Sequence, residues 1–212
     1  MPKISNRVRI LQTSRDLMNQ SGAQSISTNH ICEALKISPG NLYYHFKNKE
    51  EIVYALFLSF KTEFVGAFAD EPEKPVSPED FAGYYIRTLD IAFDYRFLFS
   101  GLLALLRRDD QLAAEYRALQ TWTLARLSAI AAQVAEDGNL GGPGTPTQYD
   151  SIALNTWLIW SNWVRHIEIS KGSSDVSRSD MVQGLHQIFD VLSGQLAPQF
   201  EAAVRAHLNQ AE

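Results

Sequence analysis

TNHICEALKISPGNLYYHFKNKEEI, residues 28–52, decides the fold of this 212-residue chain. The stretch reads as two short helices joined by a tight turn, followed by the start of a third helix. Ile31 and Leu35 share one face of the first helix, and Leu42 and Phe46 lie four residues apart on the second. Each pair therefore faces one side of its helix, and both sides meet a common core. The sequence predicts a helix-turn-helix.

The second helix leaves small, aromatic and polar side chains outside. Ser38 is a natural N-cap, Pro39 at the first helical position loses no useful N–H, and Gly40 lets the helix N-terminus approach a partner closely. A helix N-terminus attracts phosphate, and such a surface suits the major groove of DNA. The residues expected to contact DNA are Thr28, Ser38, Pro39, Gly40, Asn41, Tyr43, Tyr44, His45 and Lys49.

Two of these residues lie outside the second helix and are expected to meet the DNA backbone. Thr28, at the start of the preceding helix, offers a hydroxyl and nearby backbone N–H groups. Lys49 follows Asn48, the cap of the next helix, where the macrodipole disfavours a cation and an anionic partner such as phosphate relieves the conflict. Packing inside the domain is the alternative for the aromatic residues: Phe46 faces inward by its spacing, and Tyr44 fits either role.

This N-terminal segment resembles the TetR family of bacterial one-component transcriptional regulators, over about the first quarter of the chain. The residues that carry the resemblance are Thr28, Ile31, Ala34, Ser38, Gly40, Leu42, Tyr43, His45, Phe46 and Lys49. One departure is Lys36, at the turn position where the family usually has glycine. If that position needs a positive φ, lysine costs on the order of 1 kcal/mol there. The resemblance implies a dimer that binds double-stranded DNA and responds to a small molecule.

Charge divides the chain in the same way. Residues 1–50 hold seven Lys or Arg against three Asp or Glu, a balance of +4, whereas the whole chain carries -5. A basic end on an acidic body favours an approach in which the first domain faces phosphate. The alternative is ordinary scatter of surface charge.

Composition indicates a globular protein without disulfides or a membrane segment. Cys32 is the only cysteine, so no disulfide can form within the chain. The N-terminus lacks the apolar core of a signal peptide, and the most apolar run, residues 97–106, is too short to span a bilayer. We expect a cytoplasmic protein with no membrane partner.

Helical spacing continues through the rest of the chain, which predicts an all-α fold. Apolar residues recur at helical intervals over residues 49–69, the expected connecting helix, and a Gly- and Pro-rich stretch at 138–146 predicts a loop. The predicted domains are a three-helix DNA-binding domain with the helix-turn-helix, residues 1–48, and a larger helical domain for effector binding and dimerisation, residues 49–212.

The segment 152–169 reads as a helix that is apolar nearly all round. Such a helix must be buried on every side, which one layer of helices in a domain this size rarely achieves. We therefore expect it to pair, together with residues 178–196, with a second subunit across a two-fold axis. A dimer of this kind presents two recognition helices about one DNA turn apart, roughly 34–36 Å, and reads a pseudo-palindrome.

The same helix carries an aromatic sector and a polar stripe. The stripe contains Asn155, Asn162 and His166, whose side chains need partners when buried: the other subunit, an ordered water or a bound effector. Arg126 can meet a carboxylate if it points inward. The effector is expected to be apolar or amphipathic. The candidate effector-binding residues are Phe97, Phe99, Trp122, Arg126, Trp157, Trp160, Asn162 and His166.

An enzyme is the competing class, and its sequence motifs are missing. The chain has no phosphate-binding glycine loop, HExxH motif, nucleophile elbow or cysteine pair, and its five histidines lack metal-ligand spacing on one helix face. We expect no catalytic residues, no metal and no cofactor. The sequence favours a repressor released from its operator by an effector, and the alternative is a dimeric small-molecule carrier with a vestigial helix-turn-helix.

Overall fold

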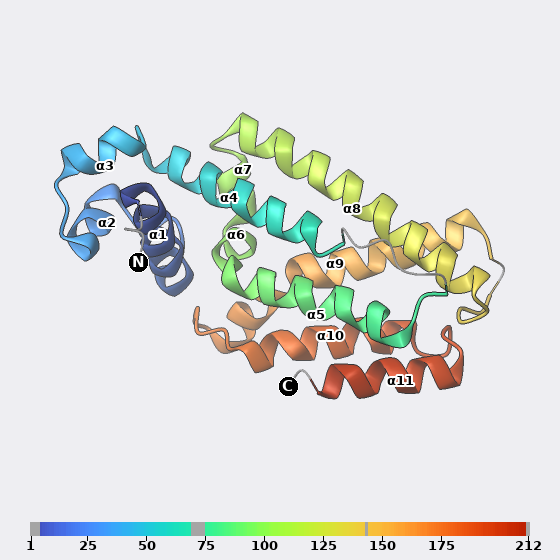
Figure 1. Cartoon of the computed structure of the whole chain (residues 1–212). Coiled ribbons are helices and arrows are strands. Elements are labelled where there is room, and N and C mark those ends of the chain that lie inside the picture. The colour runs from blue at the N-terminus through green and yellow to red at the C-terminus, as the bar shows by residue number, and fades with distance from the viewer. Residues whose placement is uncertain (1–4, 69–74, 143, 211–212) are drawn as a thin grey trace.

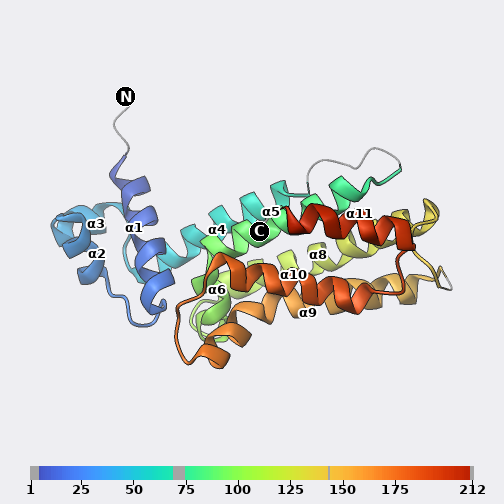
Figure 2. The ribbon, with the colours of Figure 1, turned by 90° about the horizontal axis from the view of Figure 1, so that it is seen from below.

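The computed structural model describes residues 5–68, 75–142 and 144–210. Within these ranges the chain forms helices and no strand, apart from one isolated bridge between Leu140 and Leu196. Figure 1 shows a small group of helices at the N-terminal end and a larger body, joined by a long helix, and Figure 2 shows the same division after a 90° turn. The expected all-α fold is confirmed.

Three short helices form the N-terminal group: α1 (Asn6–Ser21), α2 (Thr28–Leu35) and α3 (Pro39–His45). Each begins after a serine whose hydroxyl accepts a hydrogen bond from the backbone N–H three residues on. Their inward side chains are fully or almost fully buried, with Ile31 and Leu42 at 0% exposed and Phe46 at 3%. The predicted helix-turn-helix core is therefore present.

The turn between α2 and α3 carries backbone strain. Lys36 has φ 54° and ψ 45°, in the left-handed region, and no other non-glycine residue of the described chain has a positive φ. The backbone N–H groups of Lys36 and Ile37 donate to the carbonyl oxygens of Glu33 and Cys32 at 3.1 Å and 3.0 Å, which closes the end of α2. The positive φ expected at this position is thus observed with a lysine in it.

Helix α4 (Lys49–Gly66) runs from the N-terminal group into the body (Figure 1). Asn48 caps it by accepting a 2.8 Å hydrogen bond from Glu51 N–H. Its C-terminal end is held by two arginines of the body: Arg87 donates from Nη2 to the Ala67 carbonyl at 3.0 Å, and Arg126 donates to the Phe68 carbonyl at 3.1 Å. Residue 69 of the predicted connecting helix lies outside the described residues.

The body consists of seven further helices, which are α5 (Pro78–Asp94), α6 (Arg96–Ser100), α7 (Leu102–Leu106), α8 (Asp110–Glu136), α9 (Pro146–Lys171), α10 (Arg178–Leu192) and α11 (Pro198–Asn209). Helix α9 packs against α8 and α10, and α5 packs against α10 and α11. Prolines stand at the first position of α5, α9 and α11, where their missing N–H costs nothing. The predicted loop between Gly138 and Pro146 separates α8 from α9.

The N-terminal group is attached to the body through α1 as well as α4. Asn19 of α1 is buried, and its side chain donates to the Asp94 carbonyl at 2.8 Å and accepts from the Phe97 N–H at 3.1 Å. These two backbone groups lie at the junction of α5 and α6. The Asn19 side chain therefore joins α1 to the junction between α5 and α6 of the body.

Helix α9 is not buried on every side within one chain. Leu154, Leu158 and Ile169 are 45%, 49% and 74% exposed, and they share one face of the helix. The opposite face, which includes Trp157 and Val164, is buried. Among the described residues, no other element packs on the outer face of α9, so one chain alone does not bury the helix on every side. The second subunit that the sequence leads us to expect on this face remains a prediction.

Candidate functional site

The start of α3 has the geometry of a helix N-terminus open to a partner. Ser38 Oγ accepts from Asn41 N–H at 3.2 Å, and Pro39 occupies the first helical position. Ser38, Pro39 and Gly40 are all exposed. The end of the helix that carries the positive partial charge is thus free of large side chains.

Nothing within the protein requires a glycine at position 40. Its φ is not positive, and a Cβ added to it would meet nothing closer than Ser38 Oγ at 3.9 Å. Alanine is the better helix former, by up to about 1 kcal/mol. A glycine that the fold does not require is consistent with close approach of another molecule to this turn.

Two aromatic residues stand on the outer face of α3. Tyr43 is 49% exposed, and its hydroxyl is hydrogen-bonded to Thr28 Oγ1 at 3.2 Å, so the start of α2 fixes the end of its ring. Tyr44 is 84% exposed and touches His45 edge-on at 5.0 Å between ring centroids. Tyr44 thus does not pack inside the domain, which was one of its two expected roles.

Polar side chains beside these residues are held in place by neighbours. The Asn41 side chain accepts from Asn6 Nδ2 at 3.3 Å, and Lys49 Nζ donates to the Ala23 carbonyl at 3.0 Å. Thr28, Tyr43 and Lys49 line one open groove. The structure thus brings the predicted DNA-contacting residues to the exposed sides of α3 and the starts of α2 and α4, and their contact with DNA remains a prediction.

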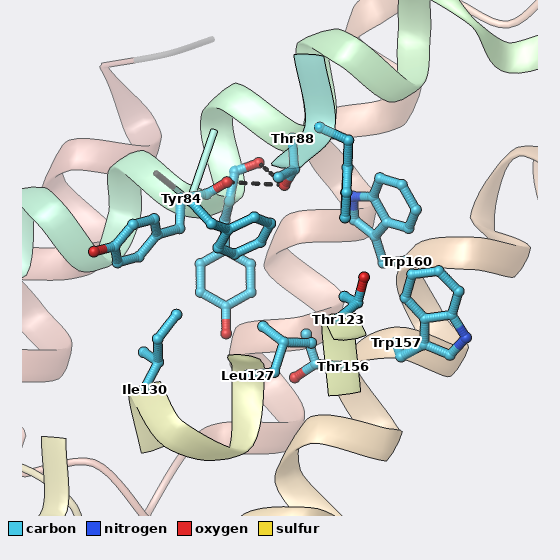
Figure 3. Close-up of a pocket in the computed structure, with 11 residues that line it drawn as sticks. Tyr84, Thr88, Thr123, Leu127, Ile130, Thr156, Trp157 and Trp160 are labelled. Carbon is cyan, nitrogen blue, oxygen red and sulfur yellow. Dashed lines mark hydrogen bonds between the residues drawn. The ribbon is translucent and has the colours of Figure 1, made fainter. Parts of the chain in front are cut away.

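A second candidate site is a cavity inside the body, between the end of α4 and helices α5, α8 and α9 (Figure 3). Its volume is about 20 Å³, enough for about one water molecule. The lining residues are Phe64, Phe68, Tyr84, Tyr85, Thr88, Thr123, Leu127, Ile130, Thr156, Trp157 and Trp160.

Most hydroxyl groups around the cavity are already hydrogen-bonded. Thr88 Oγ1 donates to the Tyr84 carbonyl at 2.8 Å, and Thr123 Oγ1 donates to the Leu119 carbonyl at 2.8 Å. Burial raises the pKa of Tyr85 to about 12, and the hydrogen bond with Thr156 acts in the opposite sense. The Tyr85 hydroxyl therefore stays neutral across the physiological range.

Trp160 is the exception among these polar groups. The ring is 9% exposed, and its Nε1 is buried without a hydrogen-bond partner. Phe64 and Phe99 hold the ring from two sides, each with ring centroids 5.0 Å from it. In Figure 3 the nitrogen of Trp160 lies on the side toward Thr88, whereas that of Trp157 points away from the other lining residues.

The structure places two of the eight predicted effector-binding residues, Trp157 and Trp160, on the cavity wall. The other six do not line it. Phe97 and Phe99 of α6 are buried in the core of the body, outside the cavity wall. Trp122 is 37% exposed, and its ring lies edge-to-face with that of Phe68. The inward carboxylate-binding role suggested for Arg126 does not fit, because its Nη2 is hydrogen-bonded to the Phe68 carbonyl.

The polar stripe of α9 also lies away from the cavity. Asn155, Asn162 and His166 are exposed in the single chain, on the face that carries Leu154 and Leu158. This corrects the expectation of buried amides. Asn162 finds its partners within the same helix, since its Nδ2 donates to the Leu158 carbonyl at 2.9 Å.

Nine lining residues were not identified from sequence, and they include Phe64, Tyr85 and Thr156. Their spacing fits a helix face that is simply buried, so no signal in the sequence separates a cavity wall from an ordinary core. Among the described residues, no three His, Cys, Asp or Glu side chains gather as a metal site. Of the described helices, none is long and apolar enough to cross a membrane.

The fold defines a helix-turn-helix protein with a larger helical body, and the family models agree. A model described as "Bacterial regulatory proteins, tetR family" matches residues 10–56, and one described as "Bacterial transcriptional repressor" matches residues 59–204. The chain belongs to the TetR family.

Individual relatives fit the same assignment. A TetR-family transcriptional regulator from Marinobacter aquaeolei VT8 is 30% identical, with a TM-score of 0.87 over 99% of this chain and 100% of that one. The HTH-type transcriptional regulator UidR of Escherichia coli K12 is 31% identical over 51% of this chain and 55% of its own length, so the chain spans about half of this curated relative. Salmonella enterica GusR, 21% identical, shares the fold, with a TM-score of 0.60 over 100% and 97% of the two chains.

Proposed function

We propose that the protein is a dimeric transcriptional repressor that binds a pseudo-palindromic DNA operator through α3 and leaves it when a small molecule enters the body. The observation that carries the proposal is the exposed first turn of α3, where a glycine serves no purpose in the fold. The relatives are named as transcriptional regulators, and nothing in their names points to an enzyme.

The surface of α3 supports a role in reading DNA. The first turn offers backbone N–H groups at the positive end of the helix, where a phosphate would be bound. Tyr43, fixed at its hydroxyl by Thr28, and Asn41 are placed one helical turn or less beyond it. We assign the N-terminus of α3, Thr28 and Lys49 to the phosphate backbone and Asn41, Tyr43 and His45 to base edges.

Dimerisation is supported by the outer face of α9. Three exposed aliphatic side chains, Leu154, Leu158 and Ile169, lie there along one helix face. The neighbouring helix α10 adds Val191, which is 40% exposed. A face of this kind suits an isologous contact with a second copy, in which α9 and α10 of both chains pack together.

The cavity supports effector control, because its wall includes the end of the helix that leads to the DNA-binding domain. Phe64 of α4 and Phe68, two residues past its end, line the cavity, and the DNA-binding domain lies at the other end of the same helix. An effector that enlarges the cavity shifts these two side chains, and the shift changes the separation of the two α3 helices in the dimer.

The division into residues 1–48 and 49–212 belongs to the same proposal, with α4 counted as the connection. A carrier with a vestigial helix-turn-helix is the second candidate, and the cavity alone would suit it equally. The exposed Gly40 and the Thr28–Tyr43 hydrogen bond favour the regulator, since a protein that no longer binds DNA has no use for either.

Selection of bound sequences from random duplex DNA tests the proposal. We expect enrichment of a pseudo-palindrome with half-sites about one turn apart, and binding that weakens steeply with salt. A protein that selects no sequence at low and moderate salt would be the carrier.

A further inference from the structure

The unpaired N–H of Trp160 is the most informative polar atom of the cavity. A buried donor without an acceptor costs roughly 1–3 kcal/mol. The ring cannot turn away to find one, because Phe64 and Phe99 pack on it. Whatever occupies the cavity next to Trp160 therefore gains by bringing an acceptor to Nε1.

The cavity offers no charged partner to an occupant. None of its lining residues is Asp, Glu, Lys, Arg or His. The two nearby guanidinium groups are committed to the end of α4: Arg87 to the Ala67 carbonyl and Arg126 to the Phe68 carbonyl. An ionised ligand would leave water without a counter-charge, which is far more costly than burying a neutral oxygen.

The wall is mainly aromatic. Six of the eleven lining residues are Phe, Tyr or Trp, and they come from α5, α9 and the end of α4. Trp157 and Trp160 lie stacked, with ring centroids 5.6 Å apart and an interplanar angle of 25°. Ring faces and edges of this density suit a planar, apolar occupant.

A second small cavity shares part of its wall with the first. Tyr85, Leu127, Ile130 and Thr156 belong to the walls of both. The second wall also holds no charged residue. The Tyr85 ring lies in both walls, so its displacement by an occupant would join the two spaces into one neutral site.

We propose that the effector is an uncharged, mainly aromatic molecule with a hydrogen-bond acceptor oxygen, and that Trp160 Nε1 donates to that oxygen. The proposal rests on the effector control proposed above and deepens it by naming the class of ligand. Trp160 selects ligands that carry an acceptor oxygen, and the uncharged wall of the cavity disfavours ionised ligands.

Matched probes, in which a methylene group replaces the ketone carbonyl or a carboxylate replaces the acetyl group, test the oxygen and the charge separately. Acetophenone and ethylbenzene form one pair, 2-acetylnaphthalene and 2-ethylnaphthalene a second, and 2-naphthoate adds a carboxylate to the second ring system. Ligand-induced shifts in Tm, converted to affinities, rank the five compounds on the full-length protein. We expect the better-fitting ketone to bind roughly tenfold more tightly than its ethyl analogue, and 2-naphthoate to bind at least about tenfold more weakly than 2-acetylnaphthalene.

Two tryptophan variants locate the effect. Trp160→Phe keeps an aromatic ring and removes the donor, so the ketone-to-ethyl ratio should fall to about one. Trp163→Phe is the matched control on the same helix, because the Nε1 of Trp163 donates to the Asp180 carbonyl at 2.8 Å, outside the cavity. Its ratio should equal that of the wild type. Trp160→Tyr, with its hydroxyl at a different place on the ring, serves where Trp160→Phe does not fold.

The inference is overturned if neither ketone binds or if 2-naphthoate binds most tightly. Equal binding of a ketone and its ethyl analogue would also overturn it, since a water molecule would then be the acceptor for Trp160. It is also overturned if the ketone preference survives in Trp160→Phe. Operator binding is measured in parallel on the same preparations. A protein that keeps the ketone preference but binds no operator would refute the regulator and leave this ligand class standing.

Discussion

The side chain of Asn19 accepts a 3.1 Å hydrogen bond from the backbone N–H of Phe97, across the boundary between the N-terminal domain and the body. Its amide nitrogen donates to the Asp94 carbonyl at the same point. Helix α6, which begins beside this contact, also carries Phe99, whose ring lies 5.0 Å from that of Trp160. A route of direct contacts therefore connects the cavity wall to α1, in addition to the route through α4.

We expect Asn19→Ala to uncouple ligand binding from DNA release. The change leaves the buried N–H of Phe97 without a partner, which costs about 1–3 kcal/mol of the free energy of unfolding. Acetophenone-type ligands should still bind, but a given occupancy should release less DNA. Gln20→Ala, one residue along on the exposed side of α1, is the control and should change neither quantity. Full release by the Asn19 variant would place all coupling in α4.

Gly40→Ala should separate stability from DNA binding. A Cβ at this position meets no close atom, and alanine favours the helix. The free energy of unfolding should therefore stay constant or rise by up to about 1 kcal/mol, and Tm should not fall. Operator affinity should fall at least tenfold, because the methyl group stands where the DNA backbone approaches. Gly66→Ala, in an equally open helical position of α4, should leave operator affinity unchanged. Unaltered binding by Gly40→Ala would remove the first turn of α3 from the interface.

Lys49→Ala and Tyr43→Phe should weaken binding in different ways. Loss of the Lys49 charge should lower affinity for operator and random DNA alike and reduce the slope of log K against log salt by about one. Tyr43→Phe removes the hydroxyl that contacts Thr28 at 3.2 Å, and it should reduce operator affinity more than affinity for random DNA. Titrations of both duplexes at several salt concentrations measure both effects. Equal losses on both duplexes for Tyr43→Phe would contradict its base-reading role.

Leu158→Glu should convert the dimer to monomer. The leucine is 49% exposed on the outer face of α9, and a carboxylate there would be buried without a partner in the proposed interface, at a cost of several kcal/mol. Leu103→Glu is the control, because Leu103 is also exposed, at 57%, on the distant helix α7. Sedimentation velocity distinguishes the two proteins. A dimeric Leu158→Glu protein would exclude this face as the interface.

Stability should depend on pH through Asp180. Its carboxylate lies 2.6 Å from Lys171 Nζ and accepts hydrogen bonds from Ser177, and these contacts lower its pKa from 3.8 to about 2. Because the unfolded chain takes up this proton at higher pH than the folded one, the contribution is complete above about pH 4 and is lost as pH falls toward 2. Chemical denaturation at several pH values should show a shallower decline in this window for Asp180→Asn. An unchanged decline would mean that other carboxyl groups dominate it.

The N-terminal domain could be predicted almost completely from sequence, because its determinants are local. Caps such as Ser38, the inward spacing of Leu42 and Phe46, and the conflict at Lys36 all act within a few residues of each other. The cavity could not be predicted, because its wall is assembled from four helices whose buried residues all follow the same period. Whether Arg126 faces a ligand or the carbonyl of Phe68 depends on tertiary packing alone.

The burial of α9 is a second feature that the sequence predicts only in part. Its apolar composition indicates that every face is covered, but composition does not say which face meets its own chain and which meets a second one. Leu158 and Trp157 are neighbours in sequence, and only the arrangement of α8 and α10 around the helix buries the tryptophan and leaves the leucine outside.

Under the effector control proposed above, the small size of the cavity would govern how quickly the protein responds. With room for about one water molecule, the resting site cannot admit an aromatic ligand by diffusion alone, and entry waits for side chains such as Tyr85 to move. At high effector concentration the rate of entry is then set by this opening motion and no longer by the supply of ligand. Once the wall closes again, departure waits for the same motion. A regulator built in this way would answer a sustained signal more fully than a brief pulse.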